Sequence, residues 1–583
     1  MTAPAFAGIE RSALGRRWRP RNVDIQRVLG YAQRTGVSEA VARILLGRAI
    51  PEEAAAGFLD PRLRDLLPDP SRLKDMDKSA DRIVTAIETG ETIAIFGDYD
   101  VDGATSAALL HGVIGAAGGH VRHYIPDRMR EGYGPNAPAL LKLGAEGAKL
   151  VITVDCGTTA HAPIEAAAGA GIDVIVVDHH AAESQLPPAF SVVNPNRIDD
   201  DCGLGQLAAV GVAFLLAVAV NRALRRNGRA TAELLDYLDL VALGTVCDVV
   251  PLVGLNRAFV AQGLKAVRAR SRLGIAALAD VAGVQERAQA FHLGFALGPR
   301  VNAGGRVGEA DLGVRLLTSA DAHEAAELAR RLDGYNRERQ RIEAEVLAAA
   351  LAQAEASAGR DLVFVAGEGW HPGVIGIVAS RLKERFERPA LVVALDGTTG
   401  KGSARSAFGW NLGAAVIAAR GEGLLVNGGG HANAAGLTVA TNGIEPLREF
   451  LSADLARHLE RAERTTLVEF DGTLPLAAAT ATLVEELERV GPYGVGNPEP
   501  RFVFNAVRVA KADIVGTSHV RCFLEDSRGA RLSAIAFRAV GTGLADILLR
   551  SDGASIHILG RLKLDTWRGA SRVQLQIEDA VAV

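Results

Sequence analysis

The fold follows from residues 92–103, which read Thr-Ile-Ala-Ile-Phe-Gly-Asp-Tyr-Asp-Val-Asp-Gly. The first part of this stretch is short, apolar and rich in β-branched side chains, as in a strand that is covered on both faces of a sheet. Three aspartates, Asp98, Asp100 and Asp102, follow it directly. Ligands bind beyond the carboxyl ends of parallel strands, so the cluster predicts a functional site at this edge of the sheet.

Two further apolar runs, each followed by polar side chains, are residues 150–154 before Asp155 and residues 172–177 before Asp178-His179-His180. Alanine-rich stretches of helical length, 105–117 and 160–170, separate the three runs. The alternation of strands and helices predicts an α/β fold with a doubly wound parallel sheet. The acidic and histidine side chains should therefore share one pocket.

Asp248 adds a fourth cluster, so the predicted pocket collects roughly six oxygen and nitrogen ligands. Carboxylates a few ångström apart repel one another, and some must stay protonated unless a metal is present. Two divalent cations about 3.5–4 Å apart would remove this repulsion, activate a bridging water and stabilise a leaving oxygen. Mixed carboxylate and imidazole ligation favours Mn²⁺ over Ca²⁺, with Mg²⁺ as an alternative. Zn²⁺ is disfavoured because no Cys/His quartet has structural-site spacing.

Each cluster also has a simpler interpretation. A single aspartate after a strand, such as Asp155, is usually a helix cap. The histidine pair alone is typical of exposed or hydrogen-bonded histidines, and the three acids beside Gly103 resemble a polar turn, although a turn needs fewer. Their common position at strand ends favours a metal site over these alternatives.

The motifs resemble those of the DHH phosphoesterase superfamily. The matching stretches are Asp100-Val101-Asp102-Gly103, Asp155, Asp178-His179-His180, Asp248 and residues 428–436, Gly-Gly-Gly-His-Ala-Asn-Ala-Ala-Gly. The last of these is similar to the signature of the accessory domain DHHA1. Stretches at 125–134, 298–306 and 491–500 are similar to those of the bacterial superfamily members that degrade single-stranded DNA from the 5′ end. The resemblance extends from about residue 70 to the end of the chain.

The resemblance implies roles for the clustered residues. Asp155 is expected to bridge two cations, and His180 to touch the phosphate or to help protonate the leaving group, which makes these two the expected catalytic residues. Asp98 is an additional expected ligand, although superfamily members often carry a histidine near this cluster. The full set of expected metal ligands is Asp98, Asp100, Asp102, Asp155, His179 and Asp248.

A second set of residues is expected to bind the substrate. Ser403 and Arg405 offer a hydroxyl and a guanidinium to a phosphate, and glycine-rich turns let backbone amides approach phosphate oxygens. Without the resemblance, each such turn is more often an ordinary loop, and the arginines are equally well read as exposed surface charges. The expected set is Arg128, Tyr133, Arg300, Asn302, Arg306, His371, Ser403, Arg405, Gly429, Gly430 and His431.

Changes in sequence texture predict five segments. They are a helical lead-in of unassigned role (1–70), a DHH catalytic domain (71–320), a connecting helix (321–358), a DHHA1 substrate-binding domain (359–464) and an OB-fold nucleic-acid-binding barrel (465–583). The charge run at 332–341 is interpreted as a solvated helix face. In the barrel, Phe504 and Phe523 are expected in the core, whereas Trp567 beside Arg568 suits base stacking.

Composition agrees with several soluble domains. The chain has 583 residues, 48% of them hydrophobic, and a net charge of −4, which does not exclude a local basic groove. The longest apolar run, 207–220, is too short to span a bilayer and predicts a buried helix. Four cysteines and a mixed N-terminus without a secretory signal indicate a cytoplasmic protein without disulfides.

These features predict a metal-dependent exonuclease that degrades single-stranded DNA 5′ to 3′ into 5′-mononucleotides. Selectivity for single strands would be steric. By analogy, the protein would work with a single-strand-binding protein and a helicase in recombination and repair. The sequence does not indicate the oligomeric state, and a monomer is the simplest expectation. One alternative is a phosphoesterase for short RNA oligomers or cyclic dinucleotides, which would have little use for a barrel. Another is an inactive member that only binds DNA or proteins, against which the complete ligand set counts.

Overall fold

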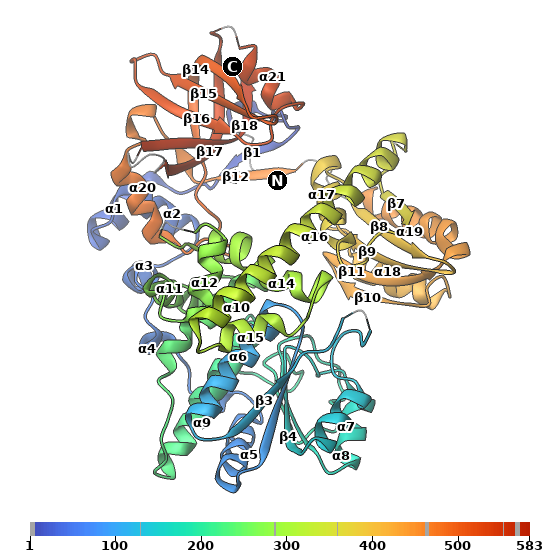
Figure 1. Cartoon of the computed structure of the whole chain (residues 1–583). Coiled ribbons are helices and arrows are strands. Elements are labelled where there is room, and N and C mark those ends of the chain that lie inside the picture. The colour runs from blue at the N-terminus through green and yellow to red at the C-terminus, as the bar shows by residue number, and fades with distance from the viewer. Residues whose placement is uncertain are drawn as a thin grey trace. The chain divides into compact units, whose positions relative to one another are not determined.

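The computed structural model describes residues 6–128, 130–284, 287–357, 359–460, 466–551, 553–565 and 572–583. Backbone contacts divide the chain into two compact units. The larger unit contains Asp69–Asp248 and Lys265–Arg464, and the smaller contains Met1–Pro68, Val249–Leu264 and Thr465–Val583. Figure 1 shows the elements with their labels.

The first lobe of the larger unit is built on a parallel sheet with the strand order β3-β2-β4-β5-β6. Its strands are β2 (Thr92–Gly97), β3 (His120–Tyr124), β4 (Ala148–Val154), β5 (Asp173–Val177) and β6 (Ser191–Val193). The main helices around it are α5 (Met76–Thr89), α6 (Val101–Ala116), α7 (Ala137–Ala145), α8 (His161–Gly169), α9 (Ala209–Arg226) and α10 (Leu238–Cys247). In Figure 1, α7 and α8 cover one face of the sheet and α5, α6 and α9 the other. The predicted doubly wound parallel sheet is confirmed.

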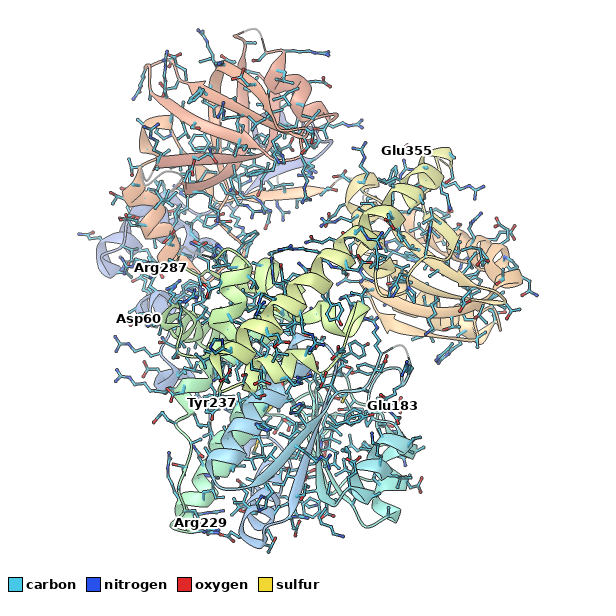
Figure 2. All side chains as sticks on the ribbon, in the orientation of Figure 1. Asp60, Glu183, Arg229, Tyr237, Arg287 and Glu355 are labelled. Carbon is cyan, nitrogen blue, oxygen red and sulfur yellow. The ribbon has the colours of Figure 1, made fainter. Side chains whose placement is uncertain are left out.

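A long helix, α16 (Ala322–Ala356), leads from this lobe into the next. It packs against α12 (Leu273–Val281), α14 (Gly298–Val307) and α15 (Leu312–Thr318) before it reaches the second lobe. Glu355, labelled in Figure 2, is an exposed residue of its last turn.

The interpretation of the α16 charge run as a solvated face is wrong for part of the run. Asp333, Asn336 and Arg339 are buried. Arg339 donates hydrogen bonds to Asn336 and Glu343, both at 2.6 Å, so the buried charges satisfy one another along the helix. They are buried because α16 packs against helices of both lobes, which a local charge pattern cannot reveal.

The second lobe has a five-stranded mixed sheet with the order β10-β11-β9-β8-β7. Its elements are β7 (Val363–Glu368), α17 (Ile375–Phe386), β8 (Ala390–Asp396), β9 (Thr399–Arg405), α18 (Leu412–Gly421), β10 (Asn427–His431), β11 (Ala434–Ala440) and α19 (Ile444–Leu459). Helices α18 and α19 cover one face of the sheet. On the other face, α16 and α17 cover β7 and β8.

The smaller unit contains the C-terminal barrel, in which β14 (Phe502–Val515), β15 (His519–Glu525), β16 (Arg531–Ala536), β18 (Arg572–Ala582) and β17 (Ser555–Asp565) close through the pairing of β14 with β17. The predicted barrel is confirmed, and Phe504 lies in its core. The expected core position of Phe523 is wrong: the residue is 42% exposed, because its neighbours Cys522 and Leu524 take the inward positions of β15. Trp567 and Arg568 lie outside the described residues.

The first 68 residues belong to the barrel unit. Strand β1 (Arg17–Pro20) pairs in parallel with β12 (Leu467–Phe470), and the buried Trp18 donates a hydrogen bond from Nε1 to Asp579 in β18 at 3.0 Å. Helices α1 (Ile25–Thr35) and α2 (Glu39–Gly47) contribute to the same hydrophobic core as the barrel. No helix in the described parts of the chain combines the length and hydropathy needed to cross a bilayer.

Candidate metal centre and substrate cavity

The ends of neighbouring strands bring the predicted acidic residues together. Asp98 follows β2 and Asp155 follows β4, and both side chains are buried. Asp100 caps the first turn of α6, because its Oδ1 accepts hydrogen bonds from the backbone N–H groups of Asp102 and Gly103 at 2.9 and 3.1 Å. The cap aims the first turn of α6 at the same edge of the sheet.

Asp102 is held by a second helix. Its two carboxylate oxygens accept hydrogen bonds from the backbone N–H groups of Ala209 and Val210 at 2.6 and 2.9 Å, at the start of α9. These donors fix the carboxylate orientation and favour its charged form, but burial and the charge of Asp100 outweigh them and raise the pKa of Asp102 to about 7. The apolar α9 therefore serves the site through its N-terminus, which matches the burial predicted for 207–220 but was not predicted as a site element.

His179 has one ring nitrogen oriented for a ligand. Its Nδ1 lies 3.0 Å from the carbonyl oxygen of Leu207, so Nδ1 carries the proton and Nε2 keeps its lone pair. Nε2 lies 3.4 Å from Asp155 and 3.6 Å from Asp248, the C-cap residue of α10. Burial, together with the charge of His180, lowers the pKa of His179 and keeps the ring neutral, the form that binds metals.

Three overlapping groups have ligand atoms within 4.8 Å of one another. They are Asp98–Asp100–Asp155, Asp102–His179–Asp248 and Asp155–His179–His180. All six predicted ligands occur in these groups, and Asp155 and His179 each occur in two. A donor set that is shared in this way suits two neighbouring cations better than one.

The donor atoms have the properties of a site that requires a cation. Among the described residues, Asp98 Oδ1, His179 Nε2 and Asp248 Oδ2 are buried without a hydrogen-bond partner. Burial raises the pKa of Asp98, Asp155 and Asp248, and the charges of the neighbouring aspartates raise each further. Such groups are costly to keep ionised together, and a divalent cation relieves both the desolvation and the repulsion. The residues therefore fit divalent metal ions.

Asp178 is not part of these groups and instead orients the histidine pair. Its carboxylate accepts hydrogen bonds from the backbone N–H groups of Thr158, His179 and His180 at 3.1, 2.8 and 3.2 Å. It also lies 2.7 Å from His180 Nδ1. Burial alone would raise the pKa of Asp178, but the hydrogen bonds from His180 and Thr158 hold it far below its usual range.

The contact with Asp178 favours the protonated form of His180. Burial opposes a proton on the ring, but the hydrogen bond to Asp178 and its negative charge outweigh burial and raise the pKa of His180. Because Asp178 is an acceptor, the Nδ1–H of His180 must donate to it. Asp178 was visible in the motif, but its orienting role depends on hydrogen bonds that sequence does not show.

A cavity of about 490 Å³ opens beside the metal ligands, within the larger unit. Tyr99, between Asp98 and Asp100, lines it, and so does Tyr133, whose hydroxyl donates to the carbonyl oxygen of Asp155 at 3.2 Å. Its predicted lining residues are Arg128, Tyr133, Arg306, Ser403, Arg405 and Gly429, and its unpredicted ones include Lys401, Asn427 and Thr438.

The cavity has the composition of an anion site. Among the described lining residues, four are cationic, namely Arg128, Arg306, Lys401 and Arg405, and none is acidic. Burial lowers the pKa of Arg306 to about 10, aided by the charge of Arg128, so Arg306 stays charged at neutral pH. Arg405 is held by neutral oxygens: its Nε donates to Ser380 Oγ at 3.1 Å and its Nη1 to Ser403 Oγ at 3.2 Å.

The N-terminus of α17 reaches the same cavity, because Ile375, Gly376 and Ile377 line it. The first N–H groups of a helix have no partner inside the helix and attract anions. Gly376 leaves room for the neighbouring side chains, since a Cβ there would lie 3.1 Å from both Arg405 Nη2 and Ser403 Oγ.

Several predicted substrate residues lie outside this lining. Arg300 donates to Asp333 Oδ1 at 2.9 Å, and Asn302 is half-buried in the same helix, α14. His371 lies near the cavity, where its Nδ1 accepts a hydrogen bond from Gly373 N–H at 3.0 Å. Gly430 lies in β10, which ends at the exposed His431. The DNA-binding roles of these five residues stay predictions.

Sequence comparisons agree with the three folded parts. Residues 92–245 match the N-terminal domain of the DHH family, residues 359–457 match the DHHA1 domain, and residues 470–579 match the RecJ OB domain. The single-stranded-DNA-specific exonuclease RecJ of Bacillus subtilis is 34% identical over 573 residues, which cover 97% of this chain and 70% of that protein. The RecJ protein of Dickeya dadantii is 37% identical over 549 residues, covering 90% and 92%. The chain belongs to the RecJ family.

Solved RecJ structures have the same fold. RecJ from Thermus thermophilus in complex with Mn²⁺ superimposes with a TM-score of 0.82 at 31% identity, covering 97% of this chain and 79% of that one. Its complex with Mg²⁺ gives a TM-score of 0.76 at 29% identity, covering 97% and 78%. The Thermus thermophilus protein is thus solved with each of the two ions that the donor types of this chain predict.

Proposed function

We propose that this chain is a metal-dependent exonuclease that degrades single-stranded DNA from the 5′ end and releases 5′-mononucleotides. The observation that carries the proposal is a cationic cavity, with no acidic residue in its described lining, that adjoins a cluster of buried carboxylates with unsatisfied ligand atoms. One part of the site attracts the negative strand, and the other requires cations. The 5′-to-3′ polarity and the role in recombination and repair come to the proposal from the RecJ family.

The metal ligands in this proposal fall into two sets. Asp98 and Asp100 would hold one cation, and Asp102, His179 and Asp248 the other, with Asp155 between them. Two divalent cations, Mn²⁺ or Mg²⁺, would supply an activated water and neutralise charge on the phosphate. The protein contributes by fixing the donors: the start of α9 holds Asp102, and the Leu207 carbonyl orients His179.

His180 is placed to move a proton. The contact to Asp178 raises its pKa and fixes the proton on Nδ1. The protonated ring can then donate from Nε2 to the leaving 3′ oxygen. About half of the side chain is exposed, so the ring is accessible to a bound strand.

The cavity would hold the 5′ end of the strand. A terminal phosphate at Ser403, Arg405 and the start of α17 would receive a hydroxyl, a guanidinium and backbone N–H groups. Tyr99 and Tyr133 connect this cavity to the metal ligands. Seating the terminal phosphate therefore presents the next phosphodiester to the carboxylates, so that one nucleotide leaves per cycle.

The remaining substrate contacts are proposed by resemblance. Arg300, Asn302, His371, Gly430 and His431 would guide the strand outside the cavity, and the barrel would bind its unpaired bases. The protein would act as a cytoplasmic monomer beside a single-strand-binding protein and a helicase.

The experiment uses one DNA oligonucleotide labelled at the 5′ or the 3′ end, with Mn²⁺, Mg²⁺ or chelator, next to the matched duplex and an RNA dinucleotide. We expect metal-dependent early release of the 5′ label as a mononucleotide from the single strand, and no release by Asp155→Asn. Cleavage of the RNA dinucleotide alone would instead assign the chain to phosphoesterases of short oligomers. Early release of the 3′ label would contradict the proposed polarity.

A further inference from the structure

The cavity contains polar side chains that the proposed terminal phosphate does not contact. From Lys401 onward, every second residue of β9 faces the cavity, namely Lys401, Ser403 and Arg405. They lie on the same face of the sheet that α17 covers at β7 and β8. Ser403 and Arg405 are assigned to the terminal phosphate. Lys401 lies one side-chain repeat away, about 7 Å along the strand.

The strand register extends Lys401 into a row of donors. Lys401 is the partner of Thr438 in β11, and Thr438 is the partner of Asn427 in β10. All three line the cavity. Asn427 Oδ1 accepts the hydrogen bond of the Gly428 N–H at 2.8 Å, which leaves its NH₂ group to donate. The row thus offers an ammonium, a hydroxyl and an amide NH₂ on one line across the sheet.

Two glycines leave open space above the sheet between this row and Arg405, a surface that we call the cavity floor. Ser403 is the partner of Gly436, and Gly436 is the partner of Gly429. A Cβ at either glycine would have no atom within 4 Å, so the space above them is open. A chain of phosphoryl groups can lie flat on this floor, with one end at Arg405 and the other at Lys401.

The charge of the cavity exceeds the charge of one phosphate. A terminal monophosphate carries about −1.5 to −2 at neutral pH, whereas four cations and one helix N-terminus face the cavity. Each added phosphoryl group brings about one more negative charge, so a triphosphate end matches the lining better. We propose that Lys401, Thr438 and Asn427 form a second phosphate subsite, and that the enzyme accepts strands with a 5′-terminal triphosphate.

This inference rests on the proposed function and predicts a distinctive product. Water adds to the phosphorus of the second nucleotide, the bond from that phosphorus to the 3′ oxygen of the first nucleotide breaks, and this oxygen takes up a proton. The first nucleotide then leaves with its triphosphate intact, and the shortened strand keeps a 5′-monophosphate. Only the first cleavage of a strand uses the second subsite.

The test compares one oligonucleotide that carries a 5′-hydroxyl, a 5′-monophosphate or a 5′-triphosphate, with chromatographic analysis of the first product. We expect a nucleoside 5′-triphosphate from the triphosphate strand, with kcat/KM at least equal to that of the monophosphate strand. Lys401→Met should lower the triphosphate-to-monophosphate ratio of kcat/KM about 10-fold. Lys383→Met, an exposed lysine in the last turn of α17, should leave this ratio unchanged.

A binding measurement separates this inference from the exonuclease proposal. With chelator present and no DNA, inorganic tripolyphosphate should stabilise the protein against heat at about 10-fold lower concentration than orthophosphate, and Lys401→Met should remove this advantage. Equal potency of the two anions in the wild type would overturn the second subsite, as would an equal loss by Lys401→Met on both strand types, which would assign the row to the sugar or base. Failure of the enzyme to cut a 5′-monophosphate strand would refute the exonuclease proposal alone.

Discussion

Replacing Gly103 by alanine should displace the backbone of Asp98 and weaken metal binding. A Cβ at Gly103 would lie 2.4 Å from the carbonyl oxygen and 2.6 Å from the backbone nitrogen of Asp98. Real Cβ contacts do not fall below 3.0 Å, so the loop between β2 and α6 must move by at least about 0.6 Å, the difference between 3.0 and 2.4 Å. No side-chain rotation can relieve this clash, because the atoms in contact belong to the backbone.

A shift of this size matters because metal sites tolerate little. Ligand distances in functional metal sites vary by about ±0.2 Å, and a 1 Å misplacement costs about 10²-fold in rate. We therefore expect Mn²⁺ affinity or turnover to fall about 10- to 100-fold in Gly103→Ala. At a fixed metal concentration, a 100-fold weaker site loses up to about 2.7 kcal/mol of ligand stabilisation, which a thermal melt with and without Mn²⁺ detects.

The same helix offers a matched control. Gly115 also lies in α6, is exposed, and a Cβ there would have no atom within 4 Å. Gly115→Ala should stabilise the protein by up to about 1 kcal/mol and leave Mn²⁺ binding and exonuclease rate unchanged. The reasoning is refuted if Gly103→Ala folds with a native circular dichroism spectrum and binds Mn²⁺ with wild-type affinity.

Four further changes test other parts of the argument. In chelator, Asp155→Asn should melt at a higher temperature than the wild type, because burial and its acidic neighbours raise the pKa of Asp155. The variant should also lose the Mn²⁺-induced shift in melting temperature. A lower melting temperature in chelator would contradict the inferred repulsion between the carboxylates. Asp178→Asn should instead lose about 1.5–3 kcal/mol of unfolding free energy in denaturant titration, because a charged acceptor of several hydrogen bonds is removed, and unchanged stability would contradict this. Arg405→Gln should lower kcat/KM about 10-fold more for a 5′-phosphorylated strand than for a 5′-hydroxyl strand. The control is Arg385→Gln, at an exposed position. Equal losses of kcat/KM on the two strands would contradict a phosphate contact. Trp18→Ala should destabilise the barrel unit by about 3–5 kcal/mol in differential scanning calorimetry, whereas a loss below about 1 kcal/mol would mean that β1 is dispensable.

The catalytic lobe was predictable because of how parallel sheets are built. Strands covered on both faces are continuous apolar runs, so β2, β4 and β5 were visible in the sequence within one or two residues. Polar residues that follow such strands must meet at one edge. This geometry brings Asp98, Asp155 and His179 together without any knowledge of side-chain positions.

Two features of the barrel unit were not predicted from the sequence: the pairing of β1 and the direction of Phe523. Strand β1 pairs with β12 about 450 positions later, as in the pairing of Trp18 with Val468, and no local pattern encodes such a partner. Aromatic residues are enriched in protein cores, which favours a core position for Phe523, but the period of β15 decides its direction. Alternation was readable in that strand, so this error was avoidable.

The polar residues that line the cavity were predicted only in part. Ser403 and Arg405 belong to a motif, whereas Lys401 joins them only because it lies on the same face of β9. Alternation could have suggested Lys401 from the sequence. Thr438 and Asn427 needed the register of three strands, which depends on turns and packing that the sequence does not specify locally.

The site has two parts, the acidic metal ligands and the cationic cavity, and their opposite charges are not paired with one another. Buried aspartates gather on one side, with unsatisfied ligand atoms on Asp98, His179 and Asp248, and the cations of the described cavity lining, which has no acidic member, gather on the other. A protein selected for stability alone would pair these groups directly, because each unsatisfied buried atom costs about 1–3 kcal/mol. Keeping the charges apart leaves the metal half open to cations and the cavity half open to phosphates. Tyr133, which lines the cavity and donates to the backbone of Asp155, connects the halves. A strand held in the cavity by its terminal phosphate, as we propose, would be repelled by the carboxylates until divalent cations neutralise them, so metal binding must precede cleavage.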